Sequence, residues 1–264
     1  MKPTGFILAA LLTGMSVAAP ATAVTREEAT LQNAMLVLRE LQAMPDLQIP
    51  DQLLARAEGI VILPENVKVG FGLGARWGTG VILVRTANRD WSNPAFVKTG
   101  AGSIGWQLGG QVADIVLVLT TQRSIEGITD GKLTLGADAS VAAGPVGRTA
   151  MASTSLTFDS EIYAYSRTKG LFAGVSLEGS GLFINTKANR RFYAGEDSAS
   201  KILANTATPP PPADELVTEI RRLTATGTTS GEAQTTAEPA ATEHPAEART
   251  YPMADQEPGK EPPR

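Results

Sequence analysis

Residues 67–85, VKVGFGLGARWGTGVILVR, decide the fold class of this chain. They contain two runs rich in valine, isoleucine and leucine, residues 67–73 and 80–85, which are separated by a few residues only. Runs of β-branched and aromatic residues between glycines are typical of strands, and the connection is too short to hold a crossover helix. The stretch therefore predicts a pair of antiparallel strands.

The same pattern continues over much of the chain. Val, Ile, Leu, Phe and Tyr recur in short runs between glycines, with no room for the helices that connect parallel strands. We expect an α+β fold on a glycine-rich, mainly antiparallel β-sheet, which is either a sandwich or barrel-like. The further predicted strands are residues 60–63, 95–98, 114–120, 132–135, 149–158, 161–166, 171–178 and 181–185.

Amphipathic helices are predicted at the N-terminal and C-terminal ends of the sheet region. Thr25 and Glu28 have the spacing of a capping box, and Pro45 ends the first helix. Shorter helices are predicted at 51–58, with Asp51 as N-cap, and at 122–128. The N-terminal stripe either packs on the sheet or enters a membrane interface. The apolar stripes are Leu31, Met35, Leu38 and Leu41 in the first helix, and Leu216, Val217, Ile220 and Leu223 in the helix at 214–223.

Three segments follow one another along the chain. Residues 1–23 have the parts of a signal peptide, namely Lys2, an apolar stretch and the small-residue pattern that ends at Ala23. Residues 24–226 form one domain. Residues 227–264 are rich in Thr, Ala, Glu and Pro, and we expect a disordered acidic tail. The chain has no cysteine, hence no lipoprotein lipidation site, so we expect a periplasmic or secreted protein.

The charge distribution argues against nucleic acid as a partner. The tail carries seven acids and three bases, which accounts for the whole formal net charge of −4. Residues 24–226 are therefore close to neutral, whereas a nucleic-acid binder normally shows a basic excess or a basic stripe. We expect no nucleic-acid partner.

Few catalytic arrangements are open to this sequence. His244 is the one histidine and lies in the tail, so the body has no Ser-His-Asp triad, Cys-His pair or His/Cys zinc site. The glycines at 70, 72 and 74 lack the strand-glycine-helix context of a phosphate loop, and close packing or a bulge explains them better. Carboxylate chemistry stays open, but we expect a non-enzymatic protein without catalytic residues, metal or cofactor.

Two aspartates in apolar surroundings are candidates for buried ion pairs. Asp114 opens an apolar run, and Asp138 lies among small residues. A buried carboxylate needs a cationic or hydrogen-bonding partner, because leaving it alone costs several kcal/mol. We expect Arg148 to pair with one of them, in a structural role rather than at a ligand site.

Five motifs then reveal a family resemblance. Residues 91–96 (WSNPAF), 102–107 (GSIGWQ), 135–140 (LGADAS), 144–148 (GPVGR) and 165–174 (YSRTKGLFAG) resemble the signature of the SYLF-domain family. The resemblance covers roughly residues 30–225 in one collinear run. It implies a binding domain, since eukaryotic relatives bind phosphoinositide-containing membranes and some bind actin.

The resemblance and the residues together favour a lipid- or membrane-binding module of the cell envelope. The alternative is a structural or protein-interaction module with an envelope protein as partner. Because the chain is expected outside the cytoplasm, actin is not expected as a partner.

A predicted hairpin turn at 167–170 is the expected lipid site. Arg167 and Lys169 would hold a phosphate headgroup, with Tyr163, Tyr165 and Phe172 on the strands behind them. Leu38 and Arg39 would contribute from the N-terminal helix, where relatives contact membranes. The alternative is an ordinary solvated turn whose aromatic residues point into the core.

Overall fold

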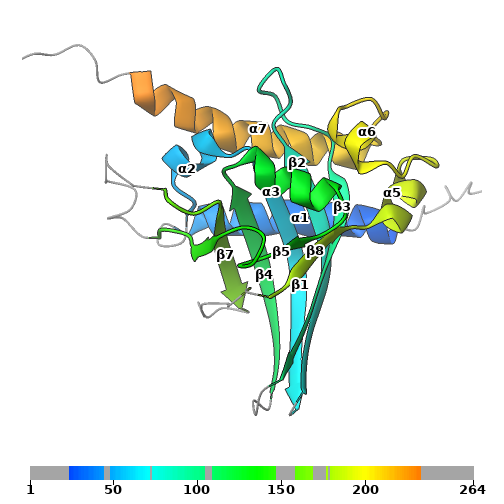
Figure 1. Cartoon of the computed structure of the whole chain (residues 1–264). Helices are drawn as coiled ribbons and strands as arrows, with labels where there is room; N and C mark the ends of the chain where they lie inside the picture. Colours follow the sequence, from blue (N-terminus) through cyan, green and yellow to red (C-terminus); the bar gives the residue numbers. More distant parts are fainter. Residues whose placement is uncertain are drawn as a thin grey trace, which may run out of the picture.

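A single curled sheet of eight strands organises the molecule (Figure 1). The computed structural model describes residues 24–44, 48–71, 73–104, 109–146, 158–168, 177 and 179–232. The strands are β1 (Gly59–Phe71), β2 (Leu73–Val84), β3 (Ala95–Ile104), β4 (Gly109–Leu119), β5 (Leu133–Thr134), β6 (Val141–Ala143), β7 (Ile162–Thr168) and β8 (Gly181–Ile184). The helices are α1 (Arg26–Ala43), α2 (Asp51–Arg56), α3 (Gln122–Thr129), α5 (Thr186–Phe192), α6 (Ala199–Leu203) and α7 (Pro211–Glu232).

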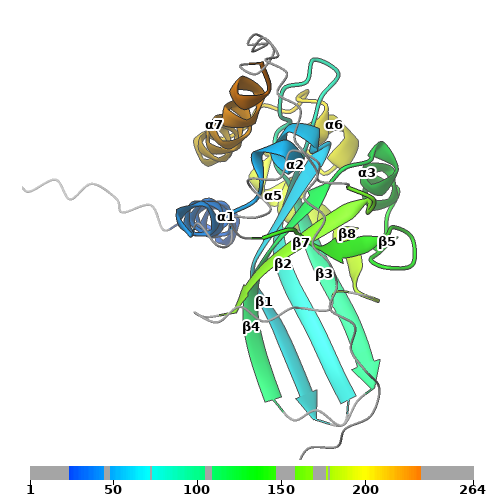
Figure 2. The same cartoon turned by 90° about the vertical axis from the view of Figure 1, so that its left-hand side faces the viewer.

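The strand order is β5-β8-β3-β2-β1-β4-β7-β6, and every pair except β6–β7 is antiparallel. The sheet curls into half a barrel (Figure 2). The predicted α+β class and the mainly antiparallel sheet are therefore confirmed, in the barrel-like form rather than as a sandwich. Two predicted strands, 149–158 and 171–178, lie almost wholly outside the described residues.

The predicted strands at 60–63 and 67–73 are one strand, β1, interrupted by a bulge. The pairing register with β2 shifts between Ile62 and Val67, and Glu65 has a positive φ of 50°. Opposite the bulge, a Cβ atom on Gly80 would collide with the carbonyl oxygen of Ile62. At position 80, therefore, close backbone approach requires a glycine, as one of the two explanations from the sequence had it.

Beyond the bulge, the ends of β1 to β4 project away from the helices (Figures 1 and 2). We call this part the arm; it comprises residues 67–71, 73–77, 100–104 and 109–112. Its strands pair throughout, with Val67 opposite Trp77 and Trp77 opposite Gly100. None of the described helices covers the arm (Figures 1 and 2). Its two faces therefore differ from the packed part of the sheet, where helices cover the side chains.

Helix α1 packs across the sheet through its predicted apolar stripe. Leu31, Met35, Leu38 and Leu41 are all buried, and the capping box between Thr25 and Glu28 is present. Of the two alternatives for this stripe, packing on the sheet is therefore the one observed. At α2, Pro50 rather than Asp51 is the N-cap residue, and no side chain caps the helix.

Helix α7 is held by residues of the WSNP motif and by the residue before it. The indole Nε1 of Trp91 donates to Thr224 Oγ1 at 3.0 Å, and Arg221 makes two 2.7 Å hydrogen bonds to Asp90. The hydrogen bond from Arg221 lowers the pKa of Asp90. The helix runs to Glu232, past the predicted domain boundary at residue 226.

The short helices α5 and α6 were not predicted. They contain seven and five residues, too few to show an apolar period.

Truncation of Leu38 should measure how much α1 packing stabilises the domain. Leu38 is 2% exposed, whereas Leu36 on the same helix is 53% exposed. We expect Leu38→Ala to lower the free energy of unfolding by about 2–5 kcal/mol, because it opens a cavity in the core. The control Leu36→Ala should change it by less than about 0.5 kcal/mol. Urea denaturation followed by circular dichroism compares them, and equal losses would contradict the packing of α1.

Candidate functional site

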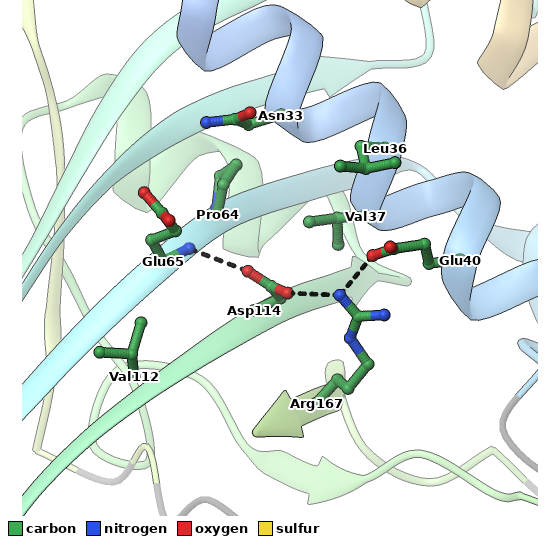
Figure 3. A pocket seen from close by; sticks show the side chains of 9 residues that line it. All are labelled: Asn33, Leu36, Val37, Glu40, Pro64, Glu65, Val112, Asp114 and Arg167. Carbon is green, nitrogen blue, oxygen red and sulfur yellow. Dashed lines mark hydrogen bonds and ion pairs between the residues drawn. The ribbon is translucent and has the colours of Figure 1, made fainter. Parts of the chain in front are cut away.

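A cavity of about 230 Å³ lies between α1 and the sheet (Figure 3). Helix α1 supplies one wall, and the bulge of β1 with the adjoining parts of β4 and β7 supplies the other. The lining residues are Asn33, Leu36, Val37, Glu40, Pro64, Glu65, Val112, Asp114 and Arg167.

Arg167 is the centre of an ion-pair cluster in this cavity. It lies directly opposite Asp114 in the β4–β7 register, and its Nη2 is 3.0 Å from Asp114 Oδ2. The same nitrogen pairs with Glu40 of α1. The backbone N–H of Glu65 donates to the other Asp114 oxygen at 3.0 Å, as Figure 3 shows. The cluster thereby joins the bulge, two strands and α1.

The charge of Arg167 is already balanced in the structure. Burial favours a lower pKa for Arg167, but its hydrogen bonds to Asp114 and Glu40 outweigh this and raise the pKa. Two carboxylates, those of Glu40 and Asp114, pair with one guanidinium. The arrangement suits a clamp on α1 better than a binding site for an anion.

The structure corrects the predicted hairpin site. Arg167 lies within β7 and not at the tip of a turn, because its register pairing with Asp114 continues the strand. Tyr163 and Tyr165 are buried, which matches the alternative in which the aromatics enter the core. Burial raises the pKa of Tyr165, whose hydroxyl donates to Pro145 O at 3.3 Å. Lys169 and Phe172 lie outside the described residues.

The structure gives Asp114 a partner that the sequence did not suggest. Arg167 pairs with it, since the β4–β7 register sets these two residues opposite each other, and the predicted pairing of Arg148 with one of the aspartates stays a prediction. Asp138 is exposed rather than buried, because it lies in a turn. There its carboxylate accepts a hydrogen bond from the backbone N–H of Thr134. That hydrogen bond lowers the pKa of Asp138. Arg148 itself lies outside the described residues.

The two candidate lipid-binding residues on α1 have separate surroundings. Leu38 is in the core and cannot meet a ligand without unfolding of the helix. Arg39 is exposed, and its guanidinium lies 3.6 Å from Glu219 of α7. Leu38 belongs to the same hydrophobic core as Tyr163 and Tyr165, whereas Arg39 lies outside that core.

A surface that was not predicted from the sequence lies on the arm and the adjoining parts of β3 and β8, on the same face of the sheet as α1. We call it the Trp77 patch. Trp77 is 49% exposed, and an added Cβ atom on the neighbouring Gly100 would touch nothing within 4 Å. The patch consists of Val69, Ala75, Trp77, Lys98 and Phe183, which share one face by register. The half-exposed tryptophan in a strand could not be recognised without knowing which face is covered.

Neither a metal site nor a membrane-spanning helix emerges from the residues that the structure describes. Within those ranges no three His, Cys, Asp or Glu side chains gather in a way that could hold a metal ion. None of the described helices is both long enough and apolar enough to cross a membrane.

The curled antiparallel sheet backed by α1 and α7 defines an α+β domain. Comparisons with known proteins show to which family this domain belongs. Residues 100–223 match the family model described as "Ysc84: Las17-binding protein actin regulator". The chain therefore carries a domain of the Ysc84 family, which is the SYLF family that the five motifs resemble. The predicted family is confirmed.

Yeast and mammalian proteins show the same relationship. "LAS seventeen-binding protein 3" of Saccharomyces cerevisiae is 39% identical over 174 residues, which are 65% of this chain and 38% of that protein. "SH3 domain-containing YSC84-like protein 1" is 37% identical over 191 residues in Bos taurus, covering 70% and 56% of the two chains. In Rattus norvegicus the identity is 34% over 207 residues, covering 76% and 61%. This chain thus spans less than two thirds of each relative.

The comparisons overturn one prediction about partners. The matching family is described as an actin regulator, and one relative is named for binding Las17. The expectation that actin is not a partner is therefore wrong, because it rested on the expected location of the chain and not on its binding surfaces.

Removal of the Arg167 cation should release the clamp on α1. In Arg167→Met, the carboxylates of Asp114 and Glu40 lose their common partner while the side-chain volume is kept. Because all three side chains keep some solvent contact, we expect a loss of about 1–3 kcal/mol in the free energy of unfolding. Arg39→Met is the control, because Arg39 is exposed and its partner Glu219 keeps the ion pair with Arg222; it should cost less than about 1 kcal/mol. Urea titrations of both variants that gave the same midpoint would show that the cluster does not stabilise α1.

Proposed function

We propose that this chain is a non-enzymatic binding module that docks on an anionic membrane surface through the Trp77 patch. The observation that carries the proposal is Trp77, half exposed on a paired strand beside an open glycine. Tryptophan is enriched at membrane–water interfaces, where its ring meets both apolar and polar surroundings.

The charges around the patch support a membrane with acidic lipids. Lys98 lies in the patch, and Lys132 Nζ lies 6.0 Å from the centre of the Phe183 ring. None of the five residues of the patch is acidic. Two lysines beside an apolar surface can reach headgroup phosphates while the tryptophan and valine enter the interface.

Replacing the anchor tests the proposal. We expect Trp77→Ser to weaken binding to phosphatidylserine-containing vesicles by at least about tenfold, since the apolar area of the indole no longer enters the interface. Raised salt should weaken the remaining binding, because it screens the lysines. Vesicle flotation measures both effects, with circular dichroism to confirm the fold.

Leu36→Ser is the matched control, because it removes an exposed apolar side chain from α1 instead of the arm. Unchanged flotation of a folded Trp77→Ser variant would refute the membrane role of the patch, and a loss confined to Leu36→Ser would assign the contact to α1.

A protein partner is the second candidate, and the names of the relatives support it. The family model is described as an actin regulator. The same Trp77→Ser and Leu36→Ser variants serve in co-sedimentation with filamentous actin. Co-sedimentation that is lost in Trp77→Ser, together with absent vesicle binding, would favour the protein-interaction function.

We further propose that the chain is exported and that residues 1–23 are removed. The capping box of α1 begins at Thr25, so cleavage after Ala23 leaves the first helix intact. We expect a protein expressed with its leader to have the intact mass of residues 24–264. A periplasmic or secreted fraction that retained Met1 would contradict this proposal.

A further inference from the structure

Arg76 is a buried cation for which the described residues offer no partner. It lies in the arm on β2, and only 7% of its surface is exposed. Its Nη1 atom is shielded from solvent and has no hydrogen-bond partner. Burial lowers the pKa of Arg76, and within the described part of the chain no acidic group offsets that effect. Burying an unpaired guanidinium costs several kcal/mol, so such a residue calls for a counter-charge.

A second cation and a second unpaired donor lie beside Arg76. Lys68 of β1 is its direct cross-strand partner, so the two side chains share one face. Asn66 is 3% exposed, and its buried Nδ2 has no acceptor. The Asn66 side chain lies over Gly78 on this same face, since an added Cβ atom there would collide with it. We call Asn66, Lys68 and Arg76 the Arg76 cluster.

The nearby carboxylates belong to the opposite face of the sheet. On β4, Gln111 pairs with Lys68 and faces the cluster, whereas Asp114 faces α1 and is held by Arg167. Glu65 lines the cavity under α1. The register partner of Arg76 on β3 is Ala101. None of these described residues brings a negative charge to Arg76.

We propose that the Arg76 cluster binds a phosphate group, as a free phosphate ester or as a lipid headgroup. The cluster supplies two positive charges and an amide donor, and no carboxylate balances them. A phosphate of charge near −2 balances both cations, whereas a single carboxylate balances one. The planar guanidinium of Arg76 can bind two phosphate oxygens at once. The cluster lies on the face opposite the Trp77 patch, so the inference does not depend on the proposed docking surface.

Titration of the full chain with inorganic phosphate, at ionic strength held constant with sodium chloride, tests the inference. We expect the melting temperature of the natural protein to rise with phosphate. Arg76→Met should lose this response, yet should melt no lower than the natural protein in phosphate-free buffer, because replacing an unpaired buried cation removes a desolvation cost. Lys187→Met, which removes an exposed cation on α5, outside both proposed binding surfaces, should keep the full response.

Flotation with phosphatidic acid vesicles, with and without excess inorganic phosphate, distinguishes the two sources of phosphate. If Arg76→Met floats less than the natural protein, and excess inorganic phosphate reduces flotation of the natural protein, the ligand is a lipid headgroup. If Arg76→Met loses the rise in melting temperature with phosphate but floats as the natural protein does, the ligand is a free phosphate ester. Trp77→Ser tests the Trp77 patch separately. A negative result for that patch therefore does not change the conclusion about the Arg76 cluster.

Three results would overturn the inference: no phosphate-specific rise in the natural protein, an equal rise in Arg76→Met, or an equal loss in Lys187→Met. If Arg76→Met does not fold, Arg76→Lys keeps the charge without the bidentate donors. It should then weaken the apparent phosphate affinity by about tenfold. An affinity equal to that of the natural protein would count against the site.

Discussion

The bulge in β1 between Ile62 and Val67 shapes much of what surrounds it. At its centre Pro64 has no N–H to donate, and Glu65 adopts a left-handed backbone conformation. The freed N–H of Glu65 is taken up by Asp114, which in turn pairs with Arg167, and Arg167 with Glu40 of α1. A local break in strand pairing thus becomes the contact through which the sheet holds its first helix. Gly80 permits the bulge, because a side chain there would strike the Ile62 carbonyl.

The bulge also separates two parts of the sheet with different chemistry. On the helix side, β1 and β4 bury continuous apolar runs, such as Ile60–Leu63, on both faces. Beyond it, none of the helices that the structure describes lies over the arm, and the alternation of side chains gives each face its own character. The face of Trp77 is apolar with lysines beside it, and the face of Arg76 is polar and cationic. Adjacent residues on β2 therefore serve opposite surfaces.

The motifs that reveal the family and the surfaces proposed for function are largely different residues. Trp91 anchors α7, Asn93 bonds to Asn205 and Ala207, and Tyr193 donates to the carbonyl of Pro94. These contacts fasten the C-terminal helices to the β2–β3 connection. Trp77 and Arg76 lie outside both the motifs and the matched residues 100–223. The family signature thus marks the framework of the domain, and the arm is where the proposals for binding are placed.

The sequence by itself determined the long helices and most strands of the fold, because their causes are local. The capping box at Thr25 and Glu28, the apolar stripe of α1 and the strand-forming runs depend on neighbours within a few residues. Only the tertiary structure decided which charges meet and which faces stay open. Arg167 could be taken for a turn residue until the β4–β7 register set it opposite Asp114. Trp77 and Arg76 could not be recognised as candidate binding residues from the sequence. The sheet shows that Trp77 is half exposed, and that Arg76 is buried with no partner among the described residues. Pairing across strands depends on register, and a shift of one residue moves every side chain to the other face, so no local pattern could supply it.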